Sequence, residues 1–456
     1  MKSSTRAGAA PGWSYLRWGV LAINCLILAL NYGDRTAISI AAPFIMNEFH
    51  FTAGEFGIIL SVFFVGYVPF CFIGGWTSDK IGPRKIMGWA AILWSVFVAA
   101  TAVGFNFISF LIIRTIFGFG EGPQGAVTTK TMGNWFPQRE LGTSIGIAQA
   151  ATPLGGAIAT PIIVGLLVAT HNNWRIPFII FGAVGIVFAI GWFVIVRDKP
   201  EQHPWITLKE LAKIREGALA RRPEYLEDGT APRMVTYLKQ PLVWSTAWAF
   251  FGYAWVLYTF LSWFPEFMLE RQHISLSNLA IAGAIPWLAG AIACALGGVV
   301  TDWLGRKTGN PAVARKWMIV VCLLLVALLF TPIGIITSPV AAVILMALIV
   351  FLLYLTTAQY FAIIGDVVPS SRLGGVMGFV HLIANLAGVV APTITGFLIT
   401  GTNNNWTAAF GIAAAICLTG SLSVAFFVRI DRSHRPPAQM ISDVHVDTVG
   451  STSSNA

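Results

Sequence analysis

Charged residues are scarce in this chain. Asp, Glu, Lys and Arg make up 11% of its 456 residues, whereas a soluble domain carries about 25%. Hydrophobic residues make up 56%, and the mean hydropathy is +0.73. A composition this apolar does not fit one soluble core, and apolar runs of about 20 residues recur from end to end. The sequence therefore predicts a polytopic membrane protein.

Cysteine and catalytic motifs are sparse as well. The five cysteines all lie in apolar runs without ligand-like spacing, so we interpret them as small buried hydrophobic residues. No Walker loop or H-E-x-x-H motif occurs, which argues against an ATP-driven pump or a zinc enzyme. GTSIG and GEGPQG match short enzyme motifs, but they lie in apolar runs and not at strand–helix turns. We therefore expect no enzyme activity, no metal and no cofactor.

The long apolar runs are predicted to be helices. They are continuous and lack the alternation of membrane β-strands, which favours helices over a barrel. The predicted fold class is an all-α membrane protein with twelve transmembrane helices in two six-helix halves. The runs lie near residues 18–44, 55–75, 86–106, 108–131, 141–168, 175–196, 242–268, 277–300, 316–337, 340–364, 373–400 and 406–428.

Polar segments divide the chain into five parts. We expect an N-terminal tail at residues 1–17, a first half at 18–196, a linker at 197–240, a second half at 241–429 and a C-terminal tail at 430–456. The linker mixes charges of both signs and is expected to contain a short surface helix. The outer parts of the tails, Met1–Pro11 and Ser433–Ala456, are rich in Ser, Ala and Pro, which predicts disorder.

The distribution of basic residues predicts the orientation. With a cytoplasmic N-terminus, 25 of the 29 Lys and Arg face the cytoplasm or its interface. Only Arg175 and Arg271 then lie in outer loops, and this asymmetry satisfies the positive-inside rule. Both termini are therefore expected to be cytoplasmic. The net charge of +9 is explained by the lipid bilayer, and no nucleic-acid partner is expected.

An internal repeat relates the two halves. GWTSDKIGPRK lies between the second and third runs, and GVVTDWLGRK lies between the eighth and ninth. A parallel repeat of two six-helix halves is typical of transporters with a site between the halves. We expect these loops to latch the halves in one conformation through charge and helix-dipole contacts. The predicted gating residues are Gly75, Asp79, Arg84, Gly298, Asp302 and Arg306.

These loops resemble the signature loops of the major facilitator superfamily, and RTIFGFGEGP resembles its R-x-x-x-G motif. NYGDR, FGEGPQ with the following NWFPQRE, and LSWFPEFM narrow the resemblance to the anion:cation symporter family. That family includes bacterial permeases for galactonate, glucarate, hexuronates and phthalate. The resemblance implies the major facilitator fold, a location in the bacterial inner (cytoplasmic) membrane, and a small organic anion as substrate.

Ionisable residues inside the runs are the strongest functional signal. Asp34 and Arg35 lie in the first run, and Arg114 and Glu121 lie in the fourth. A charge inside a bilayer is costly, so such residues face the bundle interior and mark transport pathways. Arg114 and Glu121 share a helix face but lie about 10 Å apart along the axis. Each therefore needs another partner, and we expect Asp34 opposite Arg114.

Each of these residues has a predicted role. The planar guanidinium of Arg35 suits a substrate carboxylate. Asp34 is a candidate proton carrier, because burial and a neighbouring arginine act in opposite directions on its proton affinity. The resemblance carries a proton-coupling role to Glu121, and Arg114 is expected to be structural or to assist coupling. The alternatives are a structural salt bridge for the first pair and a protonated packing carboxyl for Glu121.

Other polar residues lie in apolar surroundings. Without the resemblance, each is most simply an interhelical hydrogen bond. The resemblance to galactonate-type permeases favours four substrate contacts: Tyr32, Tyr67, Gln149 and Asn385. Gln359 and His381 are weaker candidates. The aromatic residues of the seventh run either wall the cavity or face lipid: Tyr253, Trp255, Tyr258 and Trp263.

The sequence as a whole predicts a monomeric, proton-coupled symporter of a small organic anion. A sugar acid such as galactonate, glucarate or a hexuronate is the favoured substrate, and an aromatic carboxylate such as phthalate is the alternative. A passive carrier or an exchanger of the same fold is the alternative mechanism. A membrane-embedded sensor or enzyme is a third possibility, but neither an output domain nor a reaction centre is evident in the sequence.

Overall fold

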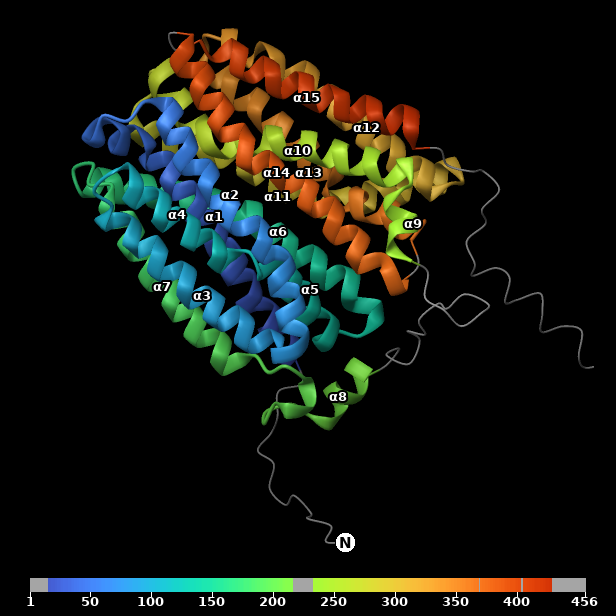
Figure 1. Ribbon diagram of the computed structural model, residues 1–456. Coiled ribbons are helices and arrows are strands. Elements are labelled where there is room, and N and C mark those ends of the chain that lie inside the picture. Colours follow the sequence, from blue (N-terminus) through green and yellow to red (C-terminus); the bar gives the residue numbers. More distant parts are fainter. Residues whose placement is uncertain (1–14, 216–232, 369, 403–404, 429–456) are drawn as a thin grey trace, which may run out of the picture.

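The computed structural model of the protein describes residues 15–215, 233–368, 370–402 and 405–428. Within them the chain forms helices α1 to α15 (Figure 1). The tails predicted to be disordered lie outside these ranges.

The helices fall into a first half, a linker and a second half. The first half contains α1 Leu16–Phe49, α2 Ala53–Ile81, α3 Pro83–Ala100, α4 Phe107–Glu121, α5 Gln124–Trp135, α6 Gln138–Ala169 and α7 Arg175–Ile195. The linker contains α8 Leu208–Arg215 and α9 Met234–Leu238. The second half contains α10 Pro241–Glu266, α11 Leu276–Thr308, α12 Pro311–Phe330, α13 Pro339–Gly365, α14 Ser370–Gly401 and α15 Trp406–Phe427. The short turns are η1 Thr101–Val103, η2 Pro200–Gln202, η4 Phe267–Arg271 and η5 Thr331–Ile335.

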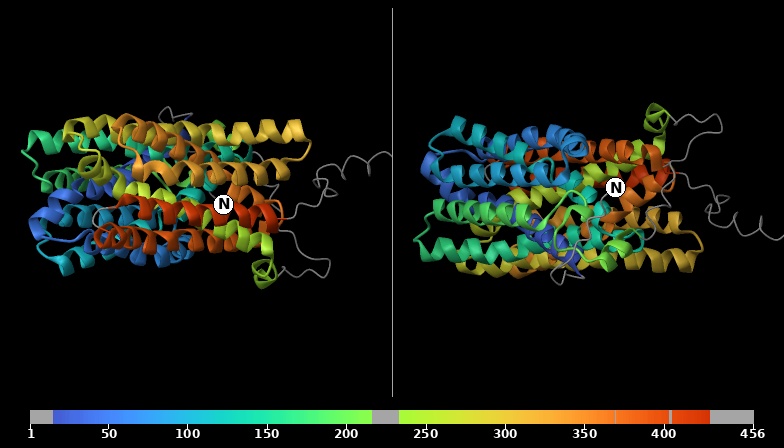
Figure 2. Two further views of the ribbon diagram at one scale, coloured as in Figure 1. Left: turned by 90° about the horizontal axis from the view of Figure 1, so that it is seen from above. Right: turned by 90° about the horizontal axis from the view of Figure 1, so that it is seen from below.

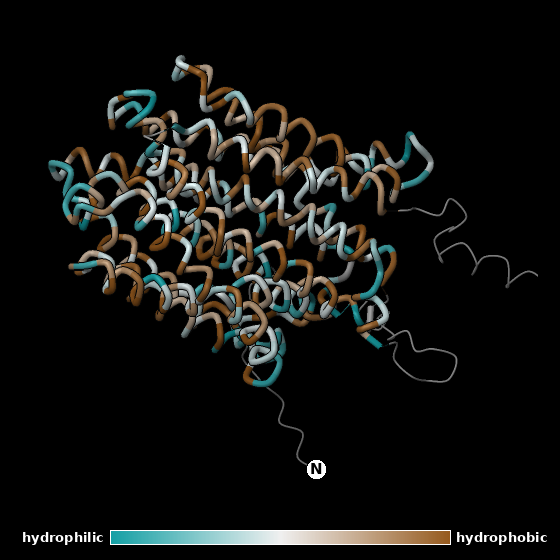
Figure 3. The backbone as a smooth tube through the Cα atoms, turned by 45° about the horizontal axis from the view of Figure 1, so that its top comes forward, coloured by the Kyte–Doolittle hydropathy of each residue, from teal (hydrophilic) through white to brown (hydrophobic). Residues whose placement is uncertain are grey.

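Ten helices of the described chain are long and apolar enough to cross a membrane. Figure 3 shows that hydrophobic residues follow the long helices and that hydrophilic ones gather at the turns. The remaining two predicted runs are α10, which is rich in Trp and Tyr, and the run at 108–131. The run at 108–131 corresponds to α4 and α5, which follow each other along the chain. The chain breaks between α4 and α5 at Gly122 and Pro123, because proline cannot donate the backbone bond that would continue a helix.

The two halves pack against each other through two pairs of helices. α6 packs against α11, and α2 packs against α14. Within the halves, α1 packs on α6, α3 on α7, α11 on α13 and α10 on α15. Both views in Figure 2 show the helices running lengthwise side by side. This arrangement confirms the predicted all-helical membrane fold.

The contacts between the halves gather toward one end of the bundle. We call the end with α8 and α9 the linker end and the opposite end the distal end. Hydrogen bonds join the first turns of α2 to the last turns of α14: Gly54 N donates to Thr400 Oγ1 at 3.1 Å, and Thr393 Oγ1 donates to Ser61 Oγ at 2.8 Å. Glycines in the linker-end turns of α6 and α14 have open space beside them: Gly142, Gly146, Gly374 and Gly378. The halves are thus closed against each other at the distal end.

The linker helix α8 is fixed to the first half. The Glu210 carboxylate accepts hydrogen bonds from the backbone N–H groups of Leu16 and Arg17 at 3.0 and 3.1 Å, which places an anion at the N-terminus of α1. The Arg17 side chain bridges Glu210 and Glu140, and Lys213 lies 2.7 Å from Glu140. The predicted short surface helix therefore exists, and it caps α1 and contacts the first turn of α6.

Glycines bring α2 and α4 into backbone contact. A Cβ added to Gly118 would lie 2.1 Å from the carbonyl oxygen of Phe63, and one added to Gly66 would lie 2.1 Å from that of Thr115. Small residues allow such close crossings of membrane helices. This crossing fixes how α4 is rotated against α2.

Gly118→Ala is expected to destabilise the protein. The methyl group meets backbone that cannot rotate away, and such overpacking costs about 1–3 kcal/mol. Thermal unfolding in detergent measures the effect. The matched control is Gly125→Ala on α5, where an added Cβ meets nothing within 4 Å. Equal melting temperatures for the two variants would contradict the close crossing.

Candidate functional site

A buried ion pair lies within the first half. Arg35 Nη2 lies 2.7 Å from Glu121 Oε2, and Arg35 Nε donates to the same oxygen at 2.9 Å. The side chains of Arg35 and Glu121 are 5% and 0% exposed. Because both nitrogens contact one oxygen, Glu121 Oε1 has no hydrogen-bond partner among the described residues. The pair joins α1 to the end of α4, directly before the break.

Asp34 lies beside this pair but is not bonded to it. Its side chain is buried, and neither carboxylate oxygen has a hydrogen-bond partner in the described part of the chain. Asp34 interacts electrostatically with Glu121, Arg114 and Arg35. No ion pair to Arg114 is formed within 4.0 Å, so the expected Asp34–Arg114 pair is absent from this conformation of the described residues. Two carboxyl groups and two guanidinium groups thus share one buried interior.

Aromatic rings surround the two arginines. The Arg35 guanidinium lies 4.7 Å from the ring centroid of Phe63, 4.8 Å from that of Tyr67 and 5.5 Å from that of Tyr32. The Arg114 guanidinium lies 5.0 Å from the same Phe63 ring. Cation–π contacts of this kind are stronger in a desolvated site. The rings therefore stabilise the buried guanidinium groups without the need for a further anion.

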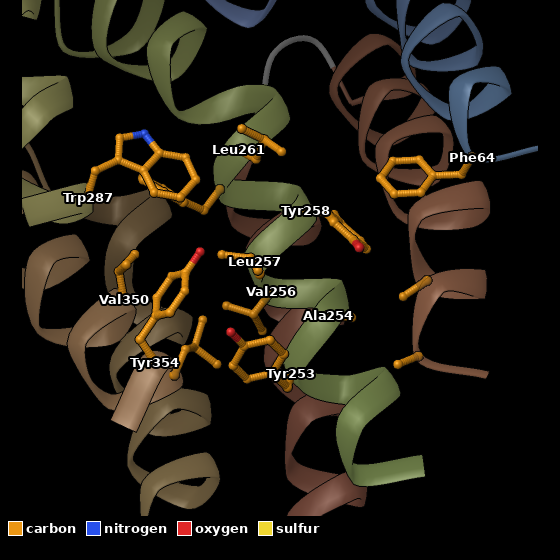
Figure 4. Close-up of a cluster of buried hydrophobic side chains, with 14 of the residues drawn as sticks. Phe64, Tyr253, Ala254, Val256, Leu257, Tyr258, Leu261, Trp287, Val350 and Tyr354 are labelled. Atoms are coloured by element: carbon orange, nitrogen blue, oxygen red, sulfur yellow. The ribbon is translucent and has the colours of Figure 1, made fainter. Parts of the chain in front are cut away.

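Residues of the second half face this cluster. The ring of Tyr258 on α10 lies 4.4 Å from that of Phe64 on α2, and Tyr32 on α1 lies 5.7 Å from Trp287 on α11. The Tyr258 hydroxyl donates to Asn385 Oδ1 at 2.7 Å. Figure 4 shows Tyr258 between the α10 ribbon and Phe64. The site is therefore built where the two halves meet.

The four aromatic candidates of α10 do not face lipid. Tyr253, Trp255, Tyr258 and Trp263 are all buried, with 8% exposure or less. Trp263 Nε1 donates to the carbonyl of Pro392 at 3.1 Å. The alternative in which these rings point into the bilayer is wrong, because they pack against α14 and the other helices of the core.

The weaker polar candidates have different surroundings. Gln359 donates to the carbonyl of Gly297 at 3.2 Å, which is an interhelical hydrogen bond. His381 lies one turn before Asn385, whose Nδ2 donates to the His381 carbonyl at 2.8 Å. Gln149 is exposed on α6 and does not join the buried cluster. Tyr32, Tyr67 and Asn385 are therefore the predicted contacts that the fold brings together.

Asn31 is a site residue that the sequence interpretation missed. It is fully buried on α1, and neither its Nδ2 nor its Oδ1 has a hydrogen-bond partner within the described ranges. It lies beside Glu121 without a hydrogen bond of normal geometry. The available signal was an amide in an apolar run, three residues before Asp34.

Comparisons with known proteins identify the family. The model of the Major Facilitator Superfamily matches residues 25–356 and 311–447. The chain belongs to the major facilitator superfamily. It is 40% identical over 402 residues to the hexuronate transporter of Bacillus subtilis, covering 88% of this chain and 92% of that protein. It is 28% identical over 400 residues to the probable L-galactonate transporter of Escherichia coli, covering 88% and 86%. These relatives confirm the predicted resemblance to bacterial sugar-acid permeases of this superfamily.

Solved structures of other major facilitator proteins share the fold. The crystal structure of the D-xylose–proton symporter superposes with a TM-score of 0.71 at 16% identity, covering 90% of this chain and 98% of that one. An inward-facing, unoccupied bacterial homologue of the human lysosomal transporter Spinster superposes with a TM-score of 0.67 at 20% identity, covering 91% and 96%. The protein is therefore a multi-pass membrane transporter by family, and this family does not consist of enzymes.

The signature loops of this major facilitator protein do not bridge the halves in this conformation. Asp79 forms an ion pair with Lys130 of α5, within the first half. Arg84 is also held within its own half, by the carbonyl of Phe193 at 2.6 Å. Asp302 and Arg306 line an open pocket with Gly305, Gly309 and Pro311, and Asp302 forms no ion pair among the residues described. The predicted latching role, which includes Gly75 and Gly298, stays a prediction for another conformation.

The buried pair should show strong coupling in a double-mutant cycle. Arg35→Leu and Glu121→Leu each leave one uncompensated charge in the interior, which costs about 3–5 kcal/mol. The double variant removes both charges and is expected to be more stable than the sum of the single changes predicts. Thermal unfolding in detergent without substrate measures all four proteins.

The control cycle uses the exposed pair Arg215 and Glu201, whose side chains are 62% and 40% exposed. Exposed pairs contribute about 0–1 kcal/mol, so these changes should be nearly additive. Additive effects at Arg35 and Glu121 would show that the interior pair is not the interaction described here.

Proposed function

We propose that this protein is a secondary active transporter that takes up a small sugar-acid anion together with protons, with a hexuronate as the favoured substrate. The observation that carries the proposal is the buried group of Asp34, Arg35, Arg114 and Glu121, placed where the two halves meet. The identity of 40% with a hexuronate transporter supports the class of substrate. Location in a bacterial cytoplasmic membrane, cytoplasmic termini, the five-part division and a monomeric state belong to the same proposal.

Competition for Arg35 couples the proton to the anion. Arg35 directs both Nε and Nη2 at Glu121 Oε2. When Glu121 takes up a proton, its charge is lost and the guanidinium is free to bind a substrate carboxylate with two parallel hydrogen bonds. Asp34 is the second proton carrier, since it shares the same interior and has no hydrogen-bond partner of its own among the described side chains.

Neighbouring side chains suit a polyhydroxylated anion. Tyr32 and Tyr67 lie around Arg35 from the first half, and Asn385 with Tyr258 lies across from them in the second. Hydroxyl and amide groups bind sugar hydroxyls, and aromatic rings cover the apolar faces of a sugar ring. Substrate binding would therefore draw on groups from both halves.

Rings of the second half also favour a second candidate substrate. Tyr253, Tyr258, Tyr354 and Trp287 gather beside the site (Figure 4). An aromatic carboxylate such as phthalate would stack on such rings. It remains the alternative substrate, and exchange or passive transport remains the alternative mechanism.

Proton coupling offsets the electrical cost of moving an anion into the cell. Each elementary charge that crosses the membrane corresponds to about 2.3 kcal/mol per 100 mV. A monoanion that enters alone opposes a negative-inside potential, whereas one proton cancels the charge. A second proton, carried by Asp34, would let the potential drive uptake.

Thermal-shift measurements on purified protein should identify the substrate class. Ligand binding raises the melting temperature in proportion to the logarithm of ligand concentration over Kd. Uronates are expected to give the largest shift, followed by aldonates and aldarates. A larger shift with phthalate than with any sugar acid would replace the favoured substrate by the alternative.

Proteoliposomes test the coupling. An inward hexuronate gradient is expected to drive proton influx, and Glu121→Gln is expected to abolish proton-driven accumulation while leaving substrate exchange partly intact. Glu270→Gln is the control, because Glu270 is an exposed carboxylate outside the buried group. Equal accumulation by Glu121→Gln and the unaltered protein would remove Glu121 from the coupling role.

A further inference from the structure

Unpartnered buried polar atoms are concentrated in the first half. Nine of the fourteen buried side-chain nitrogen and oxygen atoms without a hydrogen-bond partner in the described ranges lie on α1, α3 and α4. Buried polar groups are normally hydrogen-bonded, and ordered water supplies the partner when protein atoms do not. The atoms are Asn24 Nδ2, Asn31 Nδ2 and Oδ1, both Asp34 oxygens, Trp94 Nε1, Ser95 Oγ, Arg114 Nε and Glu121 Oε1.

Three of the polar residues of α1 form one stripe. Arg17, Asn24 and Asn31 are spaced seven residues apart and are 3%, 0% and 0% exposed. Seven residues return a helix to within about 20° of the same direction and advance it by about 10 Å. The stripe therefore runs from the side of Glu121 to the linker end, inside the first half.

Helix α5 supplies the facing side of the stripe. Thr128 Oγ1 donates to Asn24 Oδ1 at 3.1 Å, which leaves Asn24 Nδ2 unpartnered. Thr131, one turn nearer the linker end, is also fully buried. Its hydroxyl donates to the carbonyl of Val127, so its oxygen remains available as an acceptor. The contact between α1 and α5 thus contains a buried polar pair, Asn24 and Thr128.

Both ends of the stripe meet carboxyl groups. At the inner end Asn31 lies beside Glu121, whose Oε1 is unpartnered. At the linker end Arg17 contacts Glu140 and Glu210, and the Glu140 side chain is 25% exposed. The two carboxylates there balance Arg17 and Lys213, so the end of the stripe does not carry an excess of positive charge.

We propose that Asn31, Asn24 and Thr128 hold a file of ordered water molecules through which a proton leaves Glu121 for the linker end. This path lies within the first half, apart from the space between the halves, and it rests on the proton coupling proposed above. The O–H bond of Glu121 breaks, and its proton binds an adjacent water. Successive O–H bonds then form and break along the waters and the Thr128 hydroxyl until Glu140 or bulk water takes the proton.

A separate proton path affects the order in which the proton and the substrate are released. Arg35 can keep its hold on a substrate carboxylate only while Glu121 stays neutral, so the order of proton and substrate release matters. A proton that leaves through the first half does not need to wait for the substrate to clear the space between the halves. The asparagines orient the waters but do not carry the proton, so they act as positioning residues.

Two variants of the stripe test the proposal in proteoliposomes. Thr128→Val removes the hydroxyl, and Asn24→Leu replaces the amide with an apolar group of similar size. Substrate-driven proton influx is expected to fall about tenfold or more in both. Substrate exchange at equal pH, which needs no net proton release, should remain within about twofold of the unaltered protein. Asn24→Ser keeps a polar group and leaves room for water, so it should restore most of the proton influx.

The matched control is Thr129→Val. Thr129 is the exposed neighbour of Thr128, and its hydroxyl donates only to the carbonyl of Gly125 in the same helix. Normal proton influx in Thr128→Val and Asn24→Leu would overturn the path, and so would an equal loss of influx and exchange. Uptake without proton influx in the unaltered protein would instead overturn the proposed coupling itself, and the path with it.

Discussion

The buried ion pair of Arg35 and Glu121 is the interaction on which the rest of the site depends. Inside a membrane protein neither charge can be left alone, because an unpaired ion in a low-dielectric interior is far more costly than a paired one. The pair ties α1 to the end of α4 and fixes the aromatic rings of Phe63 and Tyr67 around the guanidinium. A proton that binds Glu121, or a carboxylate that binds Arg35, must change this pair.

Backbone packing determines the position of the ion pair. Gly66 and Gly118 let α2 and α4 approach until a methyl group would not fit between them. The chain then breaks at Gly122 and Pro123, so Glu121 lies at the end of a helix beside Asn31. The second half completes the site with Tyr258 and Asn385, and hydrogen bonds between α2 and α14 join the halves toward the distal end.

Much of this could be predicted from the sequence, and the errors have a common cause. The spans, the repeat, the family and the four intramembrane charges follow from composition and local pattern. The expected ion pair of Asp34 with Arg114 is not formed, and the aromatic residues of α10 were left open between cavity and lipid. Both points depend on which face of one helix packs against which face of another. Membrane helices that are hydrophobic all round have no polar face, so their sequences do not reveal this orientation.

The sequence by itself determined that the chain crosses a membrane as helices. It also determined which charged side chains lie inside the membrane and therefore need partners. The spacing of Arg114 and Glu121 also excluded a direct pair, because seven residues of helix separate them by about 10 Å. Only the tertiary structure decided that Arg35 is the partner of Glu121 and that Asp34, Asn24 and Asn31 stay unpartnered among the described residues. That choice depends on how α1 and α4 are rotated within the bundle, and the rotation of α4 is fixed by its glycine crossing with α2.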